Sequence, residues 1–237
     1  MSRTIVGKEM TETKQDIRTK AFVLRRTNYH EADRILNLLT PEGKITAIAK
    51  GARREKSKLA GGIEMFCLVD LNIHRKTNDD IGIITSAKLV EYYASLVIDL
   101  PRLEVASLII KKVNSAPDAV DAAELFDIVK QSLTALNQKK NPELVEAWFL
   151  FNYAKTCGEE VNLYRDDKGE KLVETEKYIW DIYESSLKVQ VGGNIGADEI
   201  KIMRLMLTSR LEMIFRINNV AAKIPSILSI ARAVNKI

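Results

Sequence analysis

The hydrophobic pattern of the chain changes near residue 99, and this change limits the folds that are open to it. Before that point, residues 17–93 form short β-rich segments separated by polar turns, one of which contains Pro41 and Gly43. Residues 45–49 alternate between the two faces of a strand. After residue 99, apolar residues recur at the spacing of amphipathic helices instead. The pattern predicts an α+β protein in which the strands precede the helices.

The β-rich half predicts five strands within about 80 residues, which suits a small barrel. The segment SKLAGGI at 57–63 separates the third strand from the fourth and has room for about one helical turn. A five-stranded barrel with a short helix after its third strand is the shape of an oligonucleotide-binding (OB) fold. We therefore expect a loose polar tail over 1–16, an OB-fold domain over 17–98 and an α-helical domain over 99–237.

Start and stop signals divide the second half into helices. Asn141 and Pro142 form a helix start, and Gly158 is a good residue for a helix end. Helices are expected over 101–116, 118–137, 143–157, 198–217 and 224–237. Residues 159–191 are compatible with either strand or helix.

The cysteine and histidine content argues against disulfide and metal sites. The chain has two cysteines, Cys67 and Cys157, and two scattered histidines, His30 and His74. Two cysteines cannot build a disulfide framework, and the spacing matches no common zinc signature. No apolar run approaches the roughly 20 residues of a membrane span, and the N-terminus lacks the apolar core of a signal peptide. We expect a cytoplasmic protein with no metal, no cofactor and no membrane association.

Sequence motifs for catalysis are missing as well. GARREKS at 51–57 is one residue short of a Walker phosphate loop and lacks its second glycine, and GGNIG at 192–196 departs from the dinucleotide-binding pattern. Neither G-x-S-x-G nor H-E-x-x-H occurs. We expect a protein that is not an enzyme.

The small net charge of +4 hides an uneven distribution. Residues 1–98 carry 17 Lys and Arg against 12 Asp and Glu, whereas residues 99–237 carry 19 against 20. Most of the positive excess lies in the stretch 44–58, which contains six cations and Glu55 as its one acid. A basic loop on a small barrel is the usual footprint of a nucleic-acid groove, because clustered cations displace the counterions of phosphates.

We predict DNA-binding residues in and beside this stretch. Ser57 and the neighbouring glycines would let backbone N–H groups approach a phosphate, and Tyr29, in a polar loop, would stack on a base. The predicted set is Arg25, Arg26, Tyr29, Lys44, Lys50, Arg53, Arg54, Lys56, Ser57, Lys58, Arg75 and Lys76. The alternative is a solvated basic loop with no ligand.

A second binding surface is predicted in the helical half. The expected helix over 198–217 places Arg204, Arg210 and Arg216 among apolar residues such as Met203. An apolar groove with an arginine rim can accept an acidic, apolar peptide tail. The alternative is that these arginines lie on an ordinary solvated helix face.

The order of motifs in the first half resembles the N-terminal domain of the RecO family of bacterial recombination-repair proteins. The resemblance covers about residues 18–93, and the helical remainder fits the family's C-terminal domain in length and character. The matching elements are VLRR at 23–26, the pattern Tyr29-x-Glu31-x-Asp33-Arg34, the turn Glu42-Gly43-Lys44, AKGAR at 49–53 with Ser57-x-Leu59, and TSAKLVE at 85–91.

The resemblance implies a non-enzymatic recombination mediator with an OB-fold domain followed by a helical domain. Such proteins bind single- and double-stranded DNA and anneal complementary strands. With a RecR partner they help load RecA onto DNA coated with single-strand DNA-binding protein (SSB), and they contact the acidic, apolar C-terminal tail of SSB. The resemblance implies the same partners here, in a bacterial cytoplasm and associated with the nucleoid. The alternative is an OB-fold scaffold that binds RNA or a protein without annealing strands.

One departure from the family concerns zinc. Many members of the RecO family, which this chain resembles, carry a four-cysteine zinc site in the C-terminal domain. The corresponding region here, 158–189, contains no cysteine. We therefore expect a zinc-free protein. Apolar packing would stabilise the region instead, through Leu163, Tyr178, Ile179, Trp180 and Tyr183.

Overall fold

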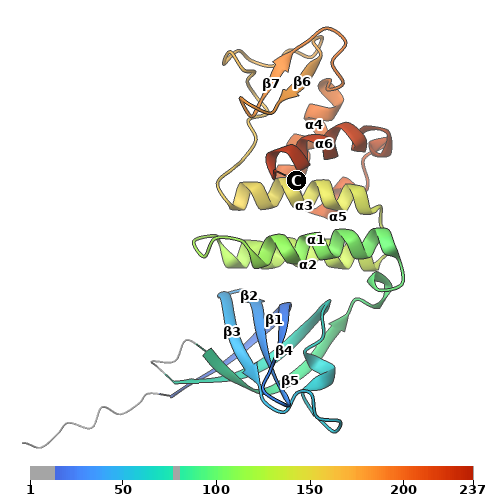
Figure 1. The fold of residues 1–237 in the computed structure, drawn as a ribbon. Helices are drawn as coiled ribbons and strands as arrows, with labels where there is room; N and C mark the ends of the chain where they lie inside the picture. The colour runs from blue at the N-terminus through green and yellow to red at the C-terminus, as the bar shows by residue number, and fades with distance from the viewer. Residues whose placement is uncertain (1–13, 77–80, 237) are drawn as a thin grey trace, which may run out of the picture. The chain divides into compact units, whose positions relative to one another are not determined.

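A computed structural model describes residues 14–76 and 81–236 (Figure 1). It has a five-stranded N-terminal sheet followed by helices, which confirms the predicted order of strands before helices. Contacts divide the chain into two compact units. One contains the residues up to Leu38 together with Ile45–Glu91, and the other contains Leu39–Lys44 together with the residues from Tyr92 onward.

The N-terminal sheet closes on itself in the strand order β1-β2-β3-β5-β4. Its long first strand pairs antiparallel with β4, with Ala21 opposite Val69, while β3 and β5 run parallel. Alternate residues such as Leu36 and Leu38 are fully buried in a shared apolar core, because a strand turns every second side chain to the same face. The strands are β1 (Lys14–Tyr29), β2 (Asp33–Thr40), β3 (Gly43–Ala49), β4 (Cys67–Lys76) and β5 (Ile81–Tyr92), and the 3-10 turn η1 (Ala60–Gly62) lies between β3 and β4.

The helical unit is built around α3 (Pro142–Thr156), which packs against four other helices. Every residue of α3 from Leu144 to Ala154 is buried, as expected of a helix surrounded by protein on all sides. The other elements are η2 (Ala94–Leu96), α1 (Leu100–Asn114), α2 (Ala122–Asn137), β6 (Tyr178–Asp181), β7 (Ser186–Val189), α4 (Ala197–Thr208), α5 (Leu211–Ile214), η3 (Val220–Lys223) and α6 (Ile224–Val234).

Polar side chains start the first three helices. The carboxylate of Asp99 accepts a hydrogen bond from a backbone N–H in the first turn of α1, and Asp121 does the same for α2. Asn141 caps α3 in the same way, as the sequence predicts. Each cap satisfies a donor that the helix itself leaves unpaired.

The helix expected over 198–217 is wrong as a single element, because the chain breaks at Ser209. There the backbone is extended and α5 begins anew at Leu211. The break is stabilised by donors from α3: the indole N–H of Trp148 donates to the Ser209 carbonyl at 3.1 Å, and the Asn152 amide donates to the Met206 carbonyl at 3.0 Å. Tertiary hydrogen bonds therefore satisfy the carbonyl groups that a continuous helix would have used.

The ambiguous stretch 159–191 contains an antiparallel hairpin, β6–β7, in which Tyr178 faces Val189 (Figure 1). Of the residues expected to pack here, Leu163 and Tyr178 are buried. The expectation for Tyr183 is wrong, since its side chain is 98% exposed in the turn between the two strands.

One further difference concerns the start of the first strand. Strand β1 begins at Lys14, within the stretch expected as a tail, because Gln15 pairs with Arg75 of β4. Residues 1–13 of that expected tail lie outside the described residues. In the described part of the chain, none of the helices has the length and apolar character of a bilayer span.

An ion pair between the buried carboxylate of Glu146 and the half-exposed guanidinium of Arg232 joins α3 to α6 and leads to a prediction. Glu146 is 3% exposed, and both of its oxygens accept hydrogen bonds from Arg232, at 2.6 and 2.8 Å. Arg232→Met leaves this carboxylate buried without its partner, so we expect the free energy of unfolding to fall by about 3 kcal/mol. Urea denaturation measures the change. Adding Glu146→Leu should recover most of the loss, and a single variant as stable as wild type would contradict the assignment.

Candidate nucleic-acid interface

The basic loop, which we define as Lys50–Lys58, follows β3 and is anchored at its base by the start of β2. The backbone N–H of Gly51 donates to the Asp33 carboxylate at 2.7 Å, and the N–H of Arg53 donates to the Ala32 carbonyl at 2.8 Å. Gly51 has φ +64°, a left-handed conformation that glycine adopts without steric cost. Asp33 therefore fixes the point at which the chain leaves the sheet.

Turns inside the basic loop fix its course. The N–H of Arg54 donates to the Gly51 carbonyl at 3.1 Å, and the N–H of Ser57 donates to the Arg54 carbonyl at 3.0 Å. The Ser57 hydroxyl accepts a hydrogen bond from the N–H of Leu59 at 3.3 Å. These bonds use backbone groups and one hydroxyl, and they leave the charged side chains free to point outward.

The five cations of the basic loop are exposed. Within residues 14–76 and 81–236, no ion pair joins any of them to a carboxylate; the guanidinium of Arg53 makes one long hydrogen bond to the His30 carbonyl, at 3.4 Å. Five like charges at close spacing repel one another, so a polyanion that neutralises several of them at once is favoured. The exposed cations are Lys50, Arg53, Arg54, Lys56 and Lys58.

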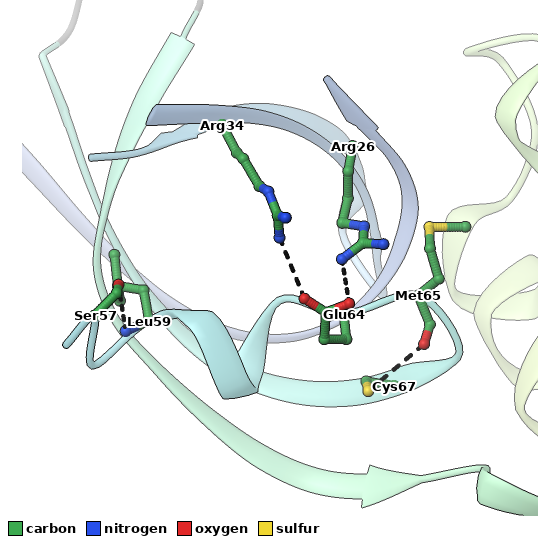
Figure 2. Close-up of polar contacts among 7 residues, drawn as sticks. All are labelled: Arg26, Arg34, Ser57, Leu59, Glu64, Met65 and Cys67. Atoms are coloured by element: carbon green, nitrogen blue, oxygen red, sulfur yellow. Dashed lines mark hydrogen bonds and ion pairs between the residues drawn. The ribbon is translucent and has the colours of Figure 1, made fainter. Parts of the chain in front are cut away.

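Glu64 holds two arginines at the base of the basic loop (Figure 2). Its Oε1 accepts from the guanidinium of Arg34 at 3.2 Å, and its Oε2 accepts from the guanidinium of Arg26. Arg26, a predicted DNA ligand, is therefore already paired. The roles of Arg34 and Glu64 were not foreseen, because a contact across 30 residues leaves no local pattern in the sequence.

The remaining predicted residues are scattered over several elements. Arg25 is exposed on β1, and Tyr29 ends that strand with 39% of its surface exposed and its ring 3.9 Å from the ring of His30. Arg75 is half-buried on β4. Lys76 ends β4, and its side chain lies outside what the structure describes.

Lys44 differs from the cations of the basic loop because its charge is already neutralised. By its contacts it belongs to the helical unit. Its ammonium group donates to the Ala116 carbonyl at 2.5 Å and lies 3.1 Å from the Asp118 carboxylate. A phosphate would have to displace these partners, so we do not keep Lys44 in the proposed DNA surface.

The Cys67 thiol is buried and lies near Glu64. Burial, and secondarily the charge of Glu64, raises the pKa of the Cys67 thiol to about 11, so this thiol stays protonated at neutral pH. In the part of the chain that the structure describes, no three His, Cys, Asp or Glu side chains gather in an arrangement that could hold a metal ion.

A second candidate surface is a cavity of about 580 Å³ between α2 and α5. Arg210 and Arg216 line it, with Leu211 and Phe215 as apolar neighbours. Arg204 does not: its guanidinium donates to the Leu163 carbonyl at 2.6 and 3.0 Å. The structure therefore brings two of the three predicted arginines to one groove. Its other lining residues include the basic Lys130 and Lys140 and the acidic Asp127 and Glu212.

The two groove arginines keep much of their charge available. Arg210 lies 3.6 Å from Asp127 with 71% of its side chain exposed, and Arg216 pairs with Glu212 with 65% exposed. Exposed pairs of this kind contribute little to stability, so a carboxylate of a ligand can replace the internal partner at small cost.

Known proteins are similar in sequence to both units of this chain. A family model described as "Recombination protein O N terminal" matches residues 11–93. A DNA repair protein RecO of Dehalococcoides mccartyi is 26% identical over 210 residues, which span 85% of this chain and 82% of that protein. A protein of the same name from Syntrophobacter fumaroxidans is 33% identical over 143 residues, spanning 60% of this chain and 56% of that protein.

The anchoring of the basic loop by Asp33 can be tested by hydrogen exchange. Asp33→Ala removes the acceptor of the Gly51 N–H, and a hydrogen bond to a charged group contributes roughly 1.5–3 kcal/mol. We expect the Gly51 amide to exchange at least about tenfold faster at neutral pH. Asp70→Ala, which removes a carboxylate on β4 that pairs with Arg18, is the matched control. Unchanged protection of Gly51 in Asp33→Ala would show that the loop is held by other contacts.

Proposed function

We propose that this chain, as a member of the RecO family, acts in DNA repair and recombination by binding DNA through the basic loop. The family match over residues 11–93 includes the whole loop and its anchor, Asp33. The observation that carries the proposal is the set of five exposed cations within nine residues, held on a backbone that its own hydrogen bonds fix.

The proposed mechanism is electrostatic. Two complementary strands repel each other through their phosphates, and a row of cations lowers this repulsion while releasing condensed counterions. Because the basic loop presents charges and backbone rather than a set of base-reading groups, it would bind strands with little sequence preference. Single- and double-stranded DNA would both be bound, and strand annealing follows from holding two strands at one basic surface.

We further propose that the five-stranded sheet is an OB fold. A 3-10 turn follows its third strand, and its order 1-2-3-5-4 has a parallel pairing between β3 and β5. OB folds bind single strands by combining basic grooves with aromatic rings on which bases stack. Tyr29, exposed at the end of β1, is the ring that we assign to this role.

The groove between α2 and α5 supports a proposal about protein partners. An acidic, apolar tail such as that of SSB would place its carboxylates near Arg210 and Arg216 and its apolar side chains near Phe215. Recruitment to SSB-coated DNA, and loading of RecA together with RecR, are the steps that we propose to follow. This role is one of binding and delivery, without bond-making chemistry.

Removing charge from the basic loop tests the DNA proposal. The variant Arg53→Ala/Arg54→Ala/Lys56→Ala/Lys58→Ala loses four phosphate contacts. For single strands, each contact contributes about 0.7 to the slope of log affinity against log salt concentration. We therefore expect the slope to flatten by roughly 3 units. Fluorescence anisotropy with a labelled oligonucleotide over a series of salt concentrations measures the slope. RNA and heparin competitors then separate DNA binding from general polyanion binding.

The matched control removes the same charge from the helical unit, at exposed lysines around the β6–β7 hairpin. These are Lys168, Lys171, Lys177 and Lys188. Their replacement by alanine should leave the slope near that of wild type. If both quadruple variants flatten the slope equally, net charge alone explains binding and the basic loop has no special part.

The tail groove is tested with a peptide that carries an acidic, apolar C-terminus. Arg210→Ala/Arg216→Ala should weaken peptide binding roughly tenfold, because two charged contacts on the carboxylates are lost. Isothermal titration calorimetry measures the dissociation constant. Lys168→Ala/Lys171→Ala removes the same charge elsewhere and should bind as wild type does. A peptide that binds both variants equally would exclude this groove.

A further inference from the structure

Glu64 makes a bridge that resembles the contact of a phosphate with two arginines. Its two oxygens have different partners: Oε1 accepts from Arg34 and Oε2 accepts from Arg26 (Figure 2). The two non-bridging oxygens of a phosphodiester offer the same pair of acceptors with one negative charge, and arginine binds carboxylates and phosphates with similar geometry. The arginine pair is therefore suited to a phosphate group as well as to the carboxylate.

The arginine pair lies at the base of the basic loop. Arg34 follows Asp33, whose carboxylate anchors Gly51 at the start of the loop. Glu64 follows η1, the turn into which the end of the loop leads. A strand that is bound by the cations of the loop therefore brings its phosphates near the two arginines.

The contact is open enough for exchange with an external anion. The side chains of Arg26 and Arg34 are 27% and 24% exposed, and that of Glu64 is 44% exposed. Glu64 lies in an irregular segment between η1 and β4, so no helix or strand hydrogen bond holds its backbone in register. Its carboxylate can move into water, where it is well solvated, when another anion takes the two guanidinium groups.

We propose that Arg26 and Arg34 form a phosphate site in which Glu64 is an internal competitor, so that the DNA backbone must displace this carboxylate to gain the two contacts. The inference rests on the proposed DNA-binding function and deepens it. Its consequence is that wild-type protein binds DNA more weakly than its cation count allows. In wild-type complexes the Glu64 carboxylate keeps the two arginines much of the time, so their contact with a DNA phosphate is made only in part.

Glu64→Gln tests the proposal, because it keeps the shape of the side chain and removes the competing charge. We expect affinity for a single-stranded oligonucleotide to rise roughly tenfold at low salt, and the log–log salt slope to steepen by about 0.7 units, since one further phosphate is contacted. Adding Arg34→Ala to Glu64→Gln should return the slope most of the way to wild type. Thermal melting of each variant checks that the fold is retained.

The matched control is Asp70→Asn. Asp70 on β4 pairs with Arg18 on β1. Its replacement by asparagine therefore changes the net charge by the same amount as Glu64→Gln and also frees an arginine. The slope of this variant should stay near that of wild type. Equal steepening in both variants, or no steepening in Glu64→Gln, would overturn the proposal and leave the Glu64 contact a structural ion pair.

A second measurement separates this inference from the proposed function. Glu64→Gln should bind inorganic phosphate, detected by phosphorus NMR line broadening, and wild type and Glu64→Gln/Arg34→Ala should not. If wild type shows no salt-dependent DNA binding but the variant still takes phosphate, the proposed function fails and the anion site stands. If DNA binds through the basic loop but the variant gains neither DNA affinity nor phosphate, the anion site fails alone.

Discussion

The pairing of β1 with β4 closes the five-stranded sheet, and the N-terminal unit depends on that closure. With both edge strands paired, alternate side chains such as Ala21 and Val69 point into one apolar core. The closed sheet also gives the basic loop a rigid base, since β2 begins at Asp33 beside the point where the loop leaves β3. A loop that binds a ligand needs such a rigid scaffold to position its side chains.

In the N-terminal unit, hydrogen bonds hold the backbone of the basic loop against the repulsion among its cations. Exposed cations on neighbouring residues repel one another and would disorder a free loop, but the hydrogen bonds of Gly51, Arg53 and Ser57 hold the backbone without using the charges. Deeper in the unit, where solvation is weaker, the two half-buried arginines are compensated by Glu64. In the described part of this unit, the cations of the basic loop are thus left uncompensated at positions where water or a ligand can solvate them.

In the helical unit, helices end inside a packed domain, where their last carbonyl groups need hydrogen-bond donors from other elements. The break after α4 leaves carbonyl groups without helical partners, and side chains of α3 supply the donors, among them Trp148, Asn152 and Lys155. The same break turns α5 toward α2 and forms the groove that holds Arg210 and Arg216. A helix that continued through Ser209 would have spread Arg204, Arg210 and Arg216 at intervals of about 120° around its axis, so the arginines would not have shared one groove.

Local patterns in the sequence determined the order of strands before helices, the helix start at Asn141 and Pro142, and the position of the basic loop. Each of these depends on residues close together in the chain, through periodicity, backbone preference or charge density. Residues 159–191 stayed open because a short apolar stretch suits a strand and a helix equally. The exposure of Tyr183, the break at Ser209 and the pairing of Lys44 needed the tertiary structure.

For the candidate DNA-binding surface, too, the sequence and the fold determine different properties. The sequence by itself determined which residues carry the charge, and the tertiary structure decided which of those charges are available. Arg26 and Arg53 are equally basic in sequence, but only the fold brings Glu64 to Arg26 and leaves Arg53 in solvent. The physical reason is that a charge acts through its distance to other charges and to water, and those distances between residues far apart in the chain exist only once the chain has folded.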